Sequence, residues 1–154
     1  MAAMNFKNFL NSCGVKYVTI EHSPAYTALE TAASAHVSGR DFAKTVIVEI
    51  GSEMAMVVLP ANRKIVLSDL QEMLADQNVK LATEDDFIKR FPDCELGAMP
   101  PFGNLYGLPV YVAQRLAEEP EIAFNAGTHR EVIKMSFAAF AELVQPTVVD
   151  FATV

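Results

Sequence analysis

Two apolar runs joined by a glycine-serine pair restrict the fold of this 154-residue chain more than any other feature. The first run covers residues 45–50 and the second covers residues 53–59, and both are rich in Val, Ile or Met. Apolar runs of this length with β-branched residues are typical of buried strands. Gly51-Ser52 leaves room only for a tight turn between them. The sequence therefore predicts a β-hairpin that the other elements must help to bury.

The rest of the chain alternates between helical and extended patterns. Helical spacing predicts helices at about 4–13, 27–36, 68–76 and 83–90 and a last helix that starts at Ser136. Extended patterns predict further strands at 15–21, 79–82, 108–112, 121–125 and 134–135. Interleaved helices and hairpins predict a mixed α/β (α+β) fold, with a mixed central sheet packed with helices. No linker divides the chain, so we expect one domain over residues 1–154.

Capping residues predict where three of these helices begin. Thr27 and Glu30 have the spacing of a capping box, and Thr83 and Asp86 have the same spacing. Ser68 is expected to cap the helix at 68–76. The inner face of that helix is predicted to hold Leu70, Met73 and Leu74.

Composition excludes several classes of protein. Twelve basic and nineteen acidic residues give a formal net charge of −7, which does not suit a general binder of polyanions. Cys13 and Cys94 form no CxxC pair, so we expect reduced thiols and a cytoplasmic location. No stretch approaches the roughly 18 apolar residues of a membrane helix, and the N-terminus lacks a signal-peptide pattern. We therefore expect no membrane association.

Several common sites also lack support in the sequence. No GxGxxG, GxxxxGK[ST] or GxSxG pattern occurs, so the usual dinucleotide, P-loop and nucleophile-elbow sites are not predicted. The three histidines and two cysteines show no zinc-binding spacing, so we expect no metal site.

Lys44 is the most informative single residue, because it stands at the start of the first apolar run in DFAKTVIVEI. A buried ammonium group needs partners, and lysine is rarely buried without them. Lys44 is therefore either a surface side chain whose amine extends to water or a cation kept for a ligand.

Two further segments carry candidate site residues. GAMPPFGNLYG (97–107) is too rich in proline and glycine for a regular helix or a central strand, so it is either a ligand-binding loop or a rigid surface turn. NAGTHR (125–130) follows a predicted strand. His129 in that segment is either a titratable site group or an ordinary surface histidine.

A third segment, EHSPAYTALE (21–30), joins a predicted strand to a predicted helix. His22 and Tyr26 flank Pro24 at this junction. The first amides of the helix are either capped by Thr27 and Glu30 or available to bind an anion, and the two uses are compatible.

Taken in order, these segments resemble the YbaK/ProX-type aminoacyl-tRNA deacylases, which are related to the editing domain inserted in bacterial prolyl-tRNA synthetases. The runs that carry the resemblance are HSPAYTALETAA (22–33), FAKTVIVEI (42–50), MVVLPANRKI (56–65), FPDCELGAMPPFG (91–103), LPVYV (108–112) and FNAGTHREVIKM (124–135). The ordered set AKT, LPAN, GAMPPFG and NAGTH makes the resemblance specific.

The resemblance implies hydrolysis, in trans, of mischarged tRNA that carries a small amino acid, with alanine and cysteine as the favoured candidates. The lysine that the family requires falls on Lys44, which is the predicted catalytic residue. The predicted substrate-binding residues are His22, Tyr26, Thr27, Gly97, Met99, Pro100, Pro101, Phe102, Gly103, Gly127 and His129, with Met99 and Phe102 expected to set the size of the pocket. The implied partners are the CCA end of aminoacyl-tRNA and an aminoacyl-tRNA synthetase, without metal or cofactor.

No Ser or Cys is paired by motif with a His and an acid, so we expect attack by a positioned water or help from the substrate's own groups. Lys44 would hold the ester or the terminal phosphate and stabilise the developing oxyanion, with main-chain amides near residues 97–103 and Gly127 as further donors. The basic residues expected near the phosphates are Arg40, Lys44, Arg63 and Lys64.

Two alternatives stay open: a non-catalytic module that holds aminoacyl-tRNA or a synthetase, and a hydrolase of another small ester or amide. Many relatives carry aspartate where this chain has Ala113, so the sequence leaves the amino acid and the tRNA open. It also leaves open the oligomeric state and the role of Cys94.

Overall fold

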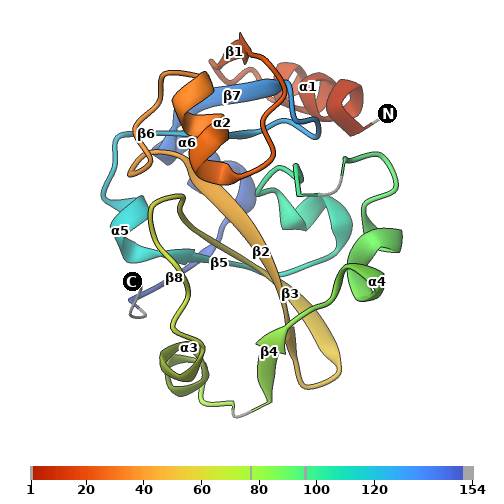
Figure 1. The fold of residues 1–154 in the computed structure, drawn as a ribbon, viewed down its shortest axis with the longest axis vertical. Coiled ribbons are helices and arrows are strands. Elements are labelled where there is room, and N and C mark those ends of the chain that lie inside the picture. The colour runs from red at the N-terminus through yellow and green to blue at the C-terminus, as the bar shows by residue number, and fades with distance from the viewer. Residues whose placement is uncertain (1, 77, 96, 151–154) are drawn as a thin grey trace.

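The computed structural model describes residues 2–76, 78–95 and 97–150, and its strands form two sheets (Figure 1). The five-stranded sheet has the order β4-β2-β3-β5-β8, made of Val79–Leu81, Ala43–Ile50, Glu53–Pro60, Val110–Ala113 and Thr147–Val149. The three-stranded sheet has the order β1-β7-β6, made of Val18–Glu21, Glu131–Ser136 and Glu121–Asn125. The smaller sheet is antiparallel, whereas β5 runs parallel to both β3 and β8, so the larger sheet is mixed.

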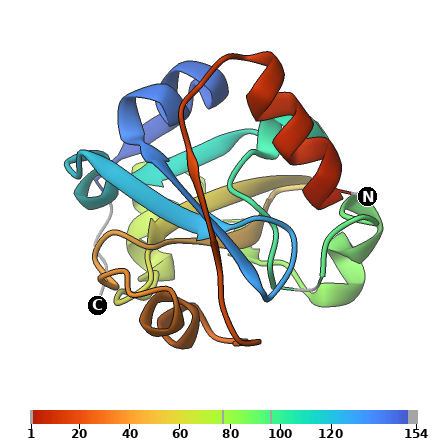
Figure 2. The same ribbon diagram turned by 90° about the horizontal axis from the view of Figure 1, so that it is seen from above.

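Helices cover both sheets. They are α1 (Ala2–Ser12), α2 (Ala28–Ser34), α3 (Leu67–Met73), α4 (Glu84–Phe87), α5 (Gln114–Ala117) and α6 (Phe137–Val144), with 3-10 turns η1 (Ile88–Arg90) and η2 (Gly103–Tyr106). Seen from above, α1 and α6 lie on one side of the three-stranded sheet and α2 lies on the other (Figure 2). The predicted mixed α/β fold is thus confirmed.

Two sheets replace the one central sheet that the sequence predicted. They meet where β2 begins: Phe42 forms a single parallel bridge with Ala123, whose amide donates to the Asp41 carbonyl at 3.0 Å. Pairing stops after this bridge because β2 continues alongside β3, while β6 pairs with β7.

The predicted hairpin is confirmed. β2 and β3 pair without a break from Ala43–Pro60 to Ile50–Glu53, and Gly51 in the turn has a φ of 64°. Such a positive φ suits glycine because it has no Cβ. Side chains alternate along β2, so Ile47 packs in the core between the sheets and Val48 packs on the opposite face.

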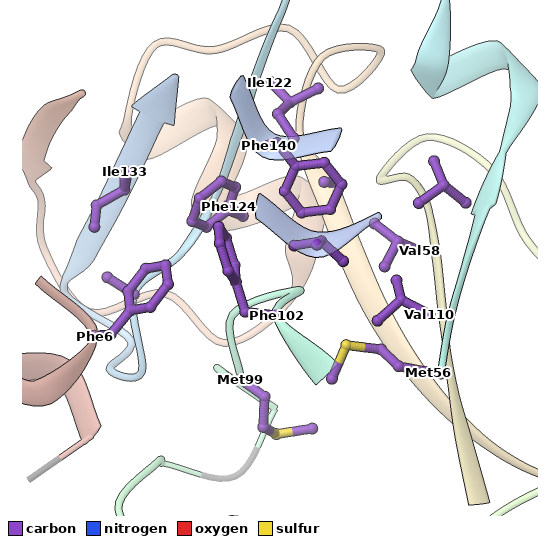
Figure 3. Packing of buried hydrophobic residues seen from close by; sticks show 14 of the residues in the cluster. Phe6, Met56, Val58, Met99, Phe102, Val110, Ile122, Phe124, Ile133 and Phe140 are labelled. Carbon is purple, nitrogen blue, oxygen red and sulfur yellow. The ribbon is translucent and has the colours of Figure 1, made fainter. Parts of the chain in front are cut away.

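The main core lies between the two sheets, and α1 and α6 contribute Phe6 and Phe140 to it (Figure 3). The Phe102 ring lies at its centre, with ring centroids 4.7 Å from Phe6 and 5.3 Å from Phe140 in edge-to-face contact. A second cluster on the other face of the larger sheet packs under α3 and includes Leu70, which is fully buried.

Capping explains the starts of three helices. The Thr27 hydroxyl accepts a hydrogen bond from the Glu30 amide, and the Glu30 carboxylate accepts one from the Thr27 amide, as the spacing predicts. The same reciprocal pair forms between Thr83 and Asp86. Ser136 caps α6 through the Ala139 amide.

The prediction for α3 was wrong in two details. Ser68 lies inside the helix, and Val66, at the cap position, makes no side-chain capping bond. Met73 is 47% exposed although it was expected on the inner face. The helix starts one residue earlier than predicted, because packing of Leu70 against the sheet, and not a cap, holds it in place.

Other differences concern short elements. The sequence did not predict α5 or β8, and β1 starts at Val18, after the predicted start at residue 15. The structure explains β8 by parallel pairing with β5, a contact between residues far apart in the chain. A three-residue strand carries little periodic signal of its own.

Gly103 has a packing role. A Cβ at this position would lie 2.8 Å from Val110 Cγ2 and 3.1 Å from the Leu108 carbonyl oxygen. The backbone of η2 therefore approaches β5 more closely than any other residue type would allow.

We expect Gly103→Ala to lower the free energy of unfolding by about 1–3 kcal/mol, because an added methyl overfills this contact. Urea denaturation followed by circular dichroism measures the change. Leu105→Ala is the matched control, because Leu105 belongs to the same 3-10 turn but is 41% exposed. Equal stability of the Gly103 variant and the unmodified protein would contradict this packing role.

Candidate active site

The structure brings two of the sequence-predicted segments into direct contact. The Glu95 amide donates to the Gly127 carbonyl at 2.8 Å, and the Gly127 amide donates to the Ala98 carbonyl at 2.9 Å. The Glu95 carboxylate in turn accepts a hydrogen bond of 2.6 Å from the His129 amide. The start of the glycine-proline loop is thus tied to the turn after β6.

The segment between β1 and α2 joins them. The His22 amide donates to the Arg130 carbonyl at 2.9 Å, and the Ala25 amide donates to the His129 carbonyl at 3.3 Å. The Tyr26 ring lies against the His129 ring with a centroid distance of 4.8 Å, while Tyr26 itself stays 71% exposed. Three segments that are distant in sequence therefore form one surface.

A cavity of about 400 Å³, here called the loop pocket, opens beside this surface. Its volume falls within the usual range of ligand pockets, about 300–1,000 Å³. Its lining residues are Tyr26, Thr45, Val46, Ile47, Leu81, Ala82, Glu84, Phe87, Gly97 and Met99.

An uncovered stretch of β2 explains why a cavity forms there. β4 pairs with β2 only from Val48 to Ile50, and β6 touches the same edge only at Phe42. Among the described residues, 44–46 of β2 therefore have no strand neighbour on this side.

Lys44 lines a second, adjoining cavity of about 290 Å³, here called the lysine pocket. The alternation of β2 places Lys44 on the face opposite Thr45, toward the α3 side of the sheet. The lysine pocket is lined by Lys44, Val46, Lys64, Ile65, Leu67 and Leu81. Val46 and Leu81 also line the loop pocket, so the two cavities meet at the open edge of β2.

The environment of Lys44 disfavours its charge. Partial burial lowers the pKa of the Lys44 amine, and the neighbouring Lys64 ammonium lowers it further. A cation held against apolar walls and beside a like charge is a good partner for an anion, because a bound anion would relieve both penalties.

The predicted site residues fall into four groups. Tyr26, Gly97 and Met99 line the loop pocket, and Lys44 lines the lysine pocket. His129 lies behind the loop pocket, since a Cβ on Gly97 would lie 3.6 Å from His129 Cε1. The remaining residues do not line either cavity: His22, Thr27, Pro100, Pro101, Phe102, Gly103 and Gly127.

Some of these residues have other physical roles. Phe102 was expected to set the size of the pocket, but its ring is wholly buried in the aromatic core, so Met99 alone of that pair borders the loop pocket. The Gly127 amide is bonded to the Ala98 carbonyl, and the Thr27 hydroxyl caps α2. The Gly127 amide is therefore not open to a ligand in this arrangement.

Two polar residues that line the loop pocket, Thr45 and Glu84, were not predicted as site residues. Lys64 lines the lysine pocket and was expected near the phosphates. Thr45 was assigned only a strand-forming role because it is β-branched, although it lies within the AKT motif. Glu84 lines the loop pocket only because α4 packs near β2 in the folded chain.

A third cavity, of about 280 Å³, lies where the two sheets meet. Its charged side chains are already paired: Arg40 lies 3.3 Å from Glu119, and Lys134 lies 3.6 Å from Glu121. This pairing makes it a weaker candidate than the two cavities beside β2.

Within the described ranges, no group of three or more His, Cys, Asp or Glu side chains is placed to hold a metal ion. The same part of the chain contains no helix long and apolar enough to cross a bilayer.

A family model for the aminoacyl-tRNA editing domain matches residues 22–143, most of the chain. This chain belongs to the aminoacyl-tRNA editing domain family. The match covers all six runs that carry the resemblance. One of them, 91–103, includes Leu96, which lies outside the described residues.

Solved structures share the fold of this editing domain at low sequence identity. The hypothetical protein APE2540 has a TM-score of 0.84 and 19% identity, over 97% of this chain and 99% of that one. A candidate trans-editing enzyme for prolyl tRNA synthetase has a TM-score of 0.81 and 20% identity, over 97% of this chain and 96% of that one. No curated protein sequence matches the chain.

Cys94 is poorly suited to act as a nucleophile in this editing domain. Burial raises the pKa of its thiol, although a contact of 3.3 Å between Cys94 Sγ and the Tyr106 hydroxyl acts weakly in the other direction. The reactive form of cysteine is the thiolate, which this environment disfavours.

We expect the pKa of Lys44 to lie below that of an ordinary lysine and to rise in a Lys64→Met variant, because that change removes a like charge. NMR titration of the lysine side-chain signals, assigned through Lys44→Arg, measures both values. Lys89→Met is the control, since Lys89 lies on the exposed turn η1. A Lys44 pKa that is unchanged by Lys64→Met would show that the two amines do not interact.

Proposed function

We propose that this editing domain hydrolyses, in trans, the ester bond of mischarged aminoacyl-tRNA that carries a small amino acid. The observation that supports this proposal most strongly is the pair of adjoining cavities at the open edge of β2. One is mainly apolar, and the other holds two lysines. An aminoacyl-tRNA end has the matching parts, an amino acid and a phosphate, joined by the ester and a ribose.

The loop pocket would take the amino acid. Ile47, Phe87 and Met99 provide apolar walls, and Gly97 lets the backbone come close to a ligand. The pocket wall would reject an amino acid with a large side chain by steric clash. An amino acid that is smaller by one methylene would lose only about 1–3 kcal/mol of binding free energy. This asymmetry favours a small residue such as alanine or cysteine, which a synthetase charges in error.

The lysine pocket would take the terminal phosphate. Lys44 and Lys64 supply two positive charges beside apolar walls formed by Ile65 and Leu67. From this position Lys44 would also stabilise negative charge on the ester oxygen as it develops. Two local positive charges are sufficient to bind the phosphate of a short single-stranded tRNA end, although the whole chain carries a formal net charge of −7.

The hydrolytic step would use water, because partial burial raises the pKa of the Cys94 thiol and so disfavours the thiolate that would act as a nucleophile. Attack by water on the ester carbon, with the ribose oxygen as leaving group, forms free amino acid and deacylated tRNA. The reaction would take place in the cytoplasm, where association with a synthetase would raise the effective concentration of substrate.

A Lys44→Ala variant should lose deacylation by about 10²- to 10³-fold, the usual cost of removing a group that stabilises an oxyanion. Release of labelled amino acid from a panel of mischarged tRNAs measures the rate, and circular dichroism confirms the fold. Lys89→Ala is the matched control and should keep full activity.

The outcomes of this experiment separate the alternatives. A loss of hydrolysis that is much larger than the loss of tRNA binding would support a catalytic role for Lys44 beyond phosphate binding. Binding without hydrolysis by the unmodified protein would instead favour a non-catalytic module, and hydrolysis of free aminoacyl esters would favour a broader esterase.

Lys64 gives a separate test of phosphate binding. Each phosphate contact with a single-stranded end contributes about 0.7 to the slope of log affinity against log salt concentration. We expect Lys64→Ala to reduce this slope by about that amount. Filter-binding titrations from low to moderate salt measure it, and an unchanged slope would place the phosphate elsewhere.

A further inference from the structure

The rim of the loop pocket carries an aromatic ring that is largely open to solvent. Tyr26 lines this cavity and is 71% exposed. Most of the surface of a tyrosine belongs to its ring and hydroxyl, so this exposure leaves much of the ring uncovered. Within the described ranges, Tyr26 is the only aromatic residue among the exposed large apolar side chains. A single exposed ring is ordinary on a protein surface, so its support and its position decide what it can do.

The Tyr26 ring is supported from below and on both sides along the chain. It lies against the ring of His129, which is 8% exposed, with an angle of 51° between the two ring planes. The preceding Ala25 amide is bonded to the His129 carbonyl, and the following Thr27 is fixed by its capping box with Glu30. A ring held in this way loses little conformational entropy when a ligand covers it.

The same support places the Tyr26 ring beside the Gly97 wall of the loop pocket. The His129 ring connects the two, because it contacts the Tyr26 ring and its Cε1 lies 3.6 Å from the position that a Cβ on Gly97 would take. Gly97 lines the loop pocket. The ring therefore borders the loop pocket, whereas Tyr26 does not line the lysine pocket.

The covalent structure of an aminoacyl-tRNA end indicates which group would meet this ring. The terminal ribose carries the ester, a phosphate and the base. The proposed function assigns the amino acid to the loop pocket and the phosphate to the lysine pocket, which leaves the base outside both cavities. No basic side chain is among the described residues that line the loop pocket, so a neutral flat group suits its rim better than a phosphate does. Aromatic side chains bind unpaired bases by stacking, because every base has a π face.

We propose that the terminal adenine of the aminoacyl-tRNA stacks on the Tyr26 ring. Tyr26 is then a substrate-binding residue that holds the third substituent of the ribose. Three points of attachment fix the orientation of the ribose, so the ester is presented to Lys44 in one position. This inference rests on the proposed function, because the base is placed relative to the two cavities.

Variants of the ring test the stacking. Tyr26→Ala removes the ring, while Tyr26→Phe keeps it. The probe is an adenosine that carries alanine at its 3′ position through an amide, which resists hydrolysis. Calorimetry should show that Tyr26→Ala binds this probe about 5- to 100-fold more weakly, the usual loss when the platform for one base is removed, and that Tyr26→Phe stays within about twofold of the unmodified protein. Val18→Ala is the control and should bind normally, because Val18 is 58% exposed and lines neither cavity.

A second probe tests whether the base is the group that is recognised. The same alanyl amide on a ribose without a base should bind the unmodified protein and Tyr26→Ala equally. The NMR signals of the Tyr26 ring, assigned through Tyr26→Phe, should move to lower chemical shift with the adenosine probe, because a stacked adenine shields the ring, and should stay in place with the base-free probe. A loss that persists with the base-free probe, or ring signals that do not move with the adenosine probe, would overturn the assignment to the base.

Melting temperature separates recognition of the base from folding. Tyr26→Ala should melt within about 2 °C of the unmodified protein, because substitutions of exposed residues change stability little. A large fall in melting temperature, with equally weakened binding of both probes, would show that the ring serves to hold the segment between β1 and α2. That result would overturn the proposal.

The binding and deacylation assays fail independently. If the adenosine probe binds the unmodified protein and Tyr26→Ala equally, or binds neither, the Tyr26 proposal is overturned even where deacylation is observed. If the probe binds in the expected order but no tRNA is deacylated, the proposed hydrolytic function fails and the role of Tyr26 in binding the base stands.

Discussion

The pairing of β2 with β3 is the interaction on which the rest of this structure depends. It fixes the register of β2, and the register sets which side chains face the main core and which face α3. A shift of the β2 register by one residue would turn Lys44 toward the main core and Thr45 toward α3. Both cavities depend on this alternation, because they open on either side of the same short stretch of strand.

The two cavities divide charge between them. Lys44 and Lys64 lie on one side of the β2 edge, and Glu84 lies on the other. A substrate with an amine at one end and a phosphate at the other would be held in one orientation only, since the reverse would bring like charges together. Orientation is the main requirement for a site that must place one ester beside one amine.

Two groups in this region are held in unfavourable surroundings. Burial and a like charge lower the pKa of Lys44, and the Thr45 hydroxyl is shielded without a partner in the described chain. Groups of this kind reduce stability, and they are found more often at functional sites than elsewhere. They are adjacent in sequence, so a single stretch of strand carries both.

The sequence by itself determined the hairpin and the helix starts at Thr27, Thr83 and Ser136, because these depend on local periodicity and capping. Its ordered motifs also carried the resemblance to the family. It also identified Lys44 as unusual. Only the tertiary structure showed that Lys44 and Gly97 line different cavities, that Phe102 belongs to the core, and that Thr45 faces a pocket. Those facts depend on contacts between segments that are distant in sequence. β4 pairs with only part of β2, and the loops pack around Gly127. No local sequence pattern predicts such contacts.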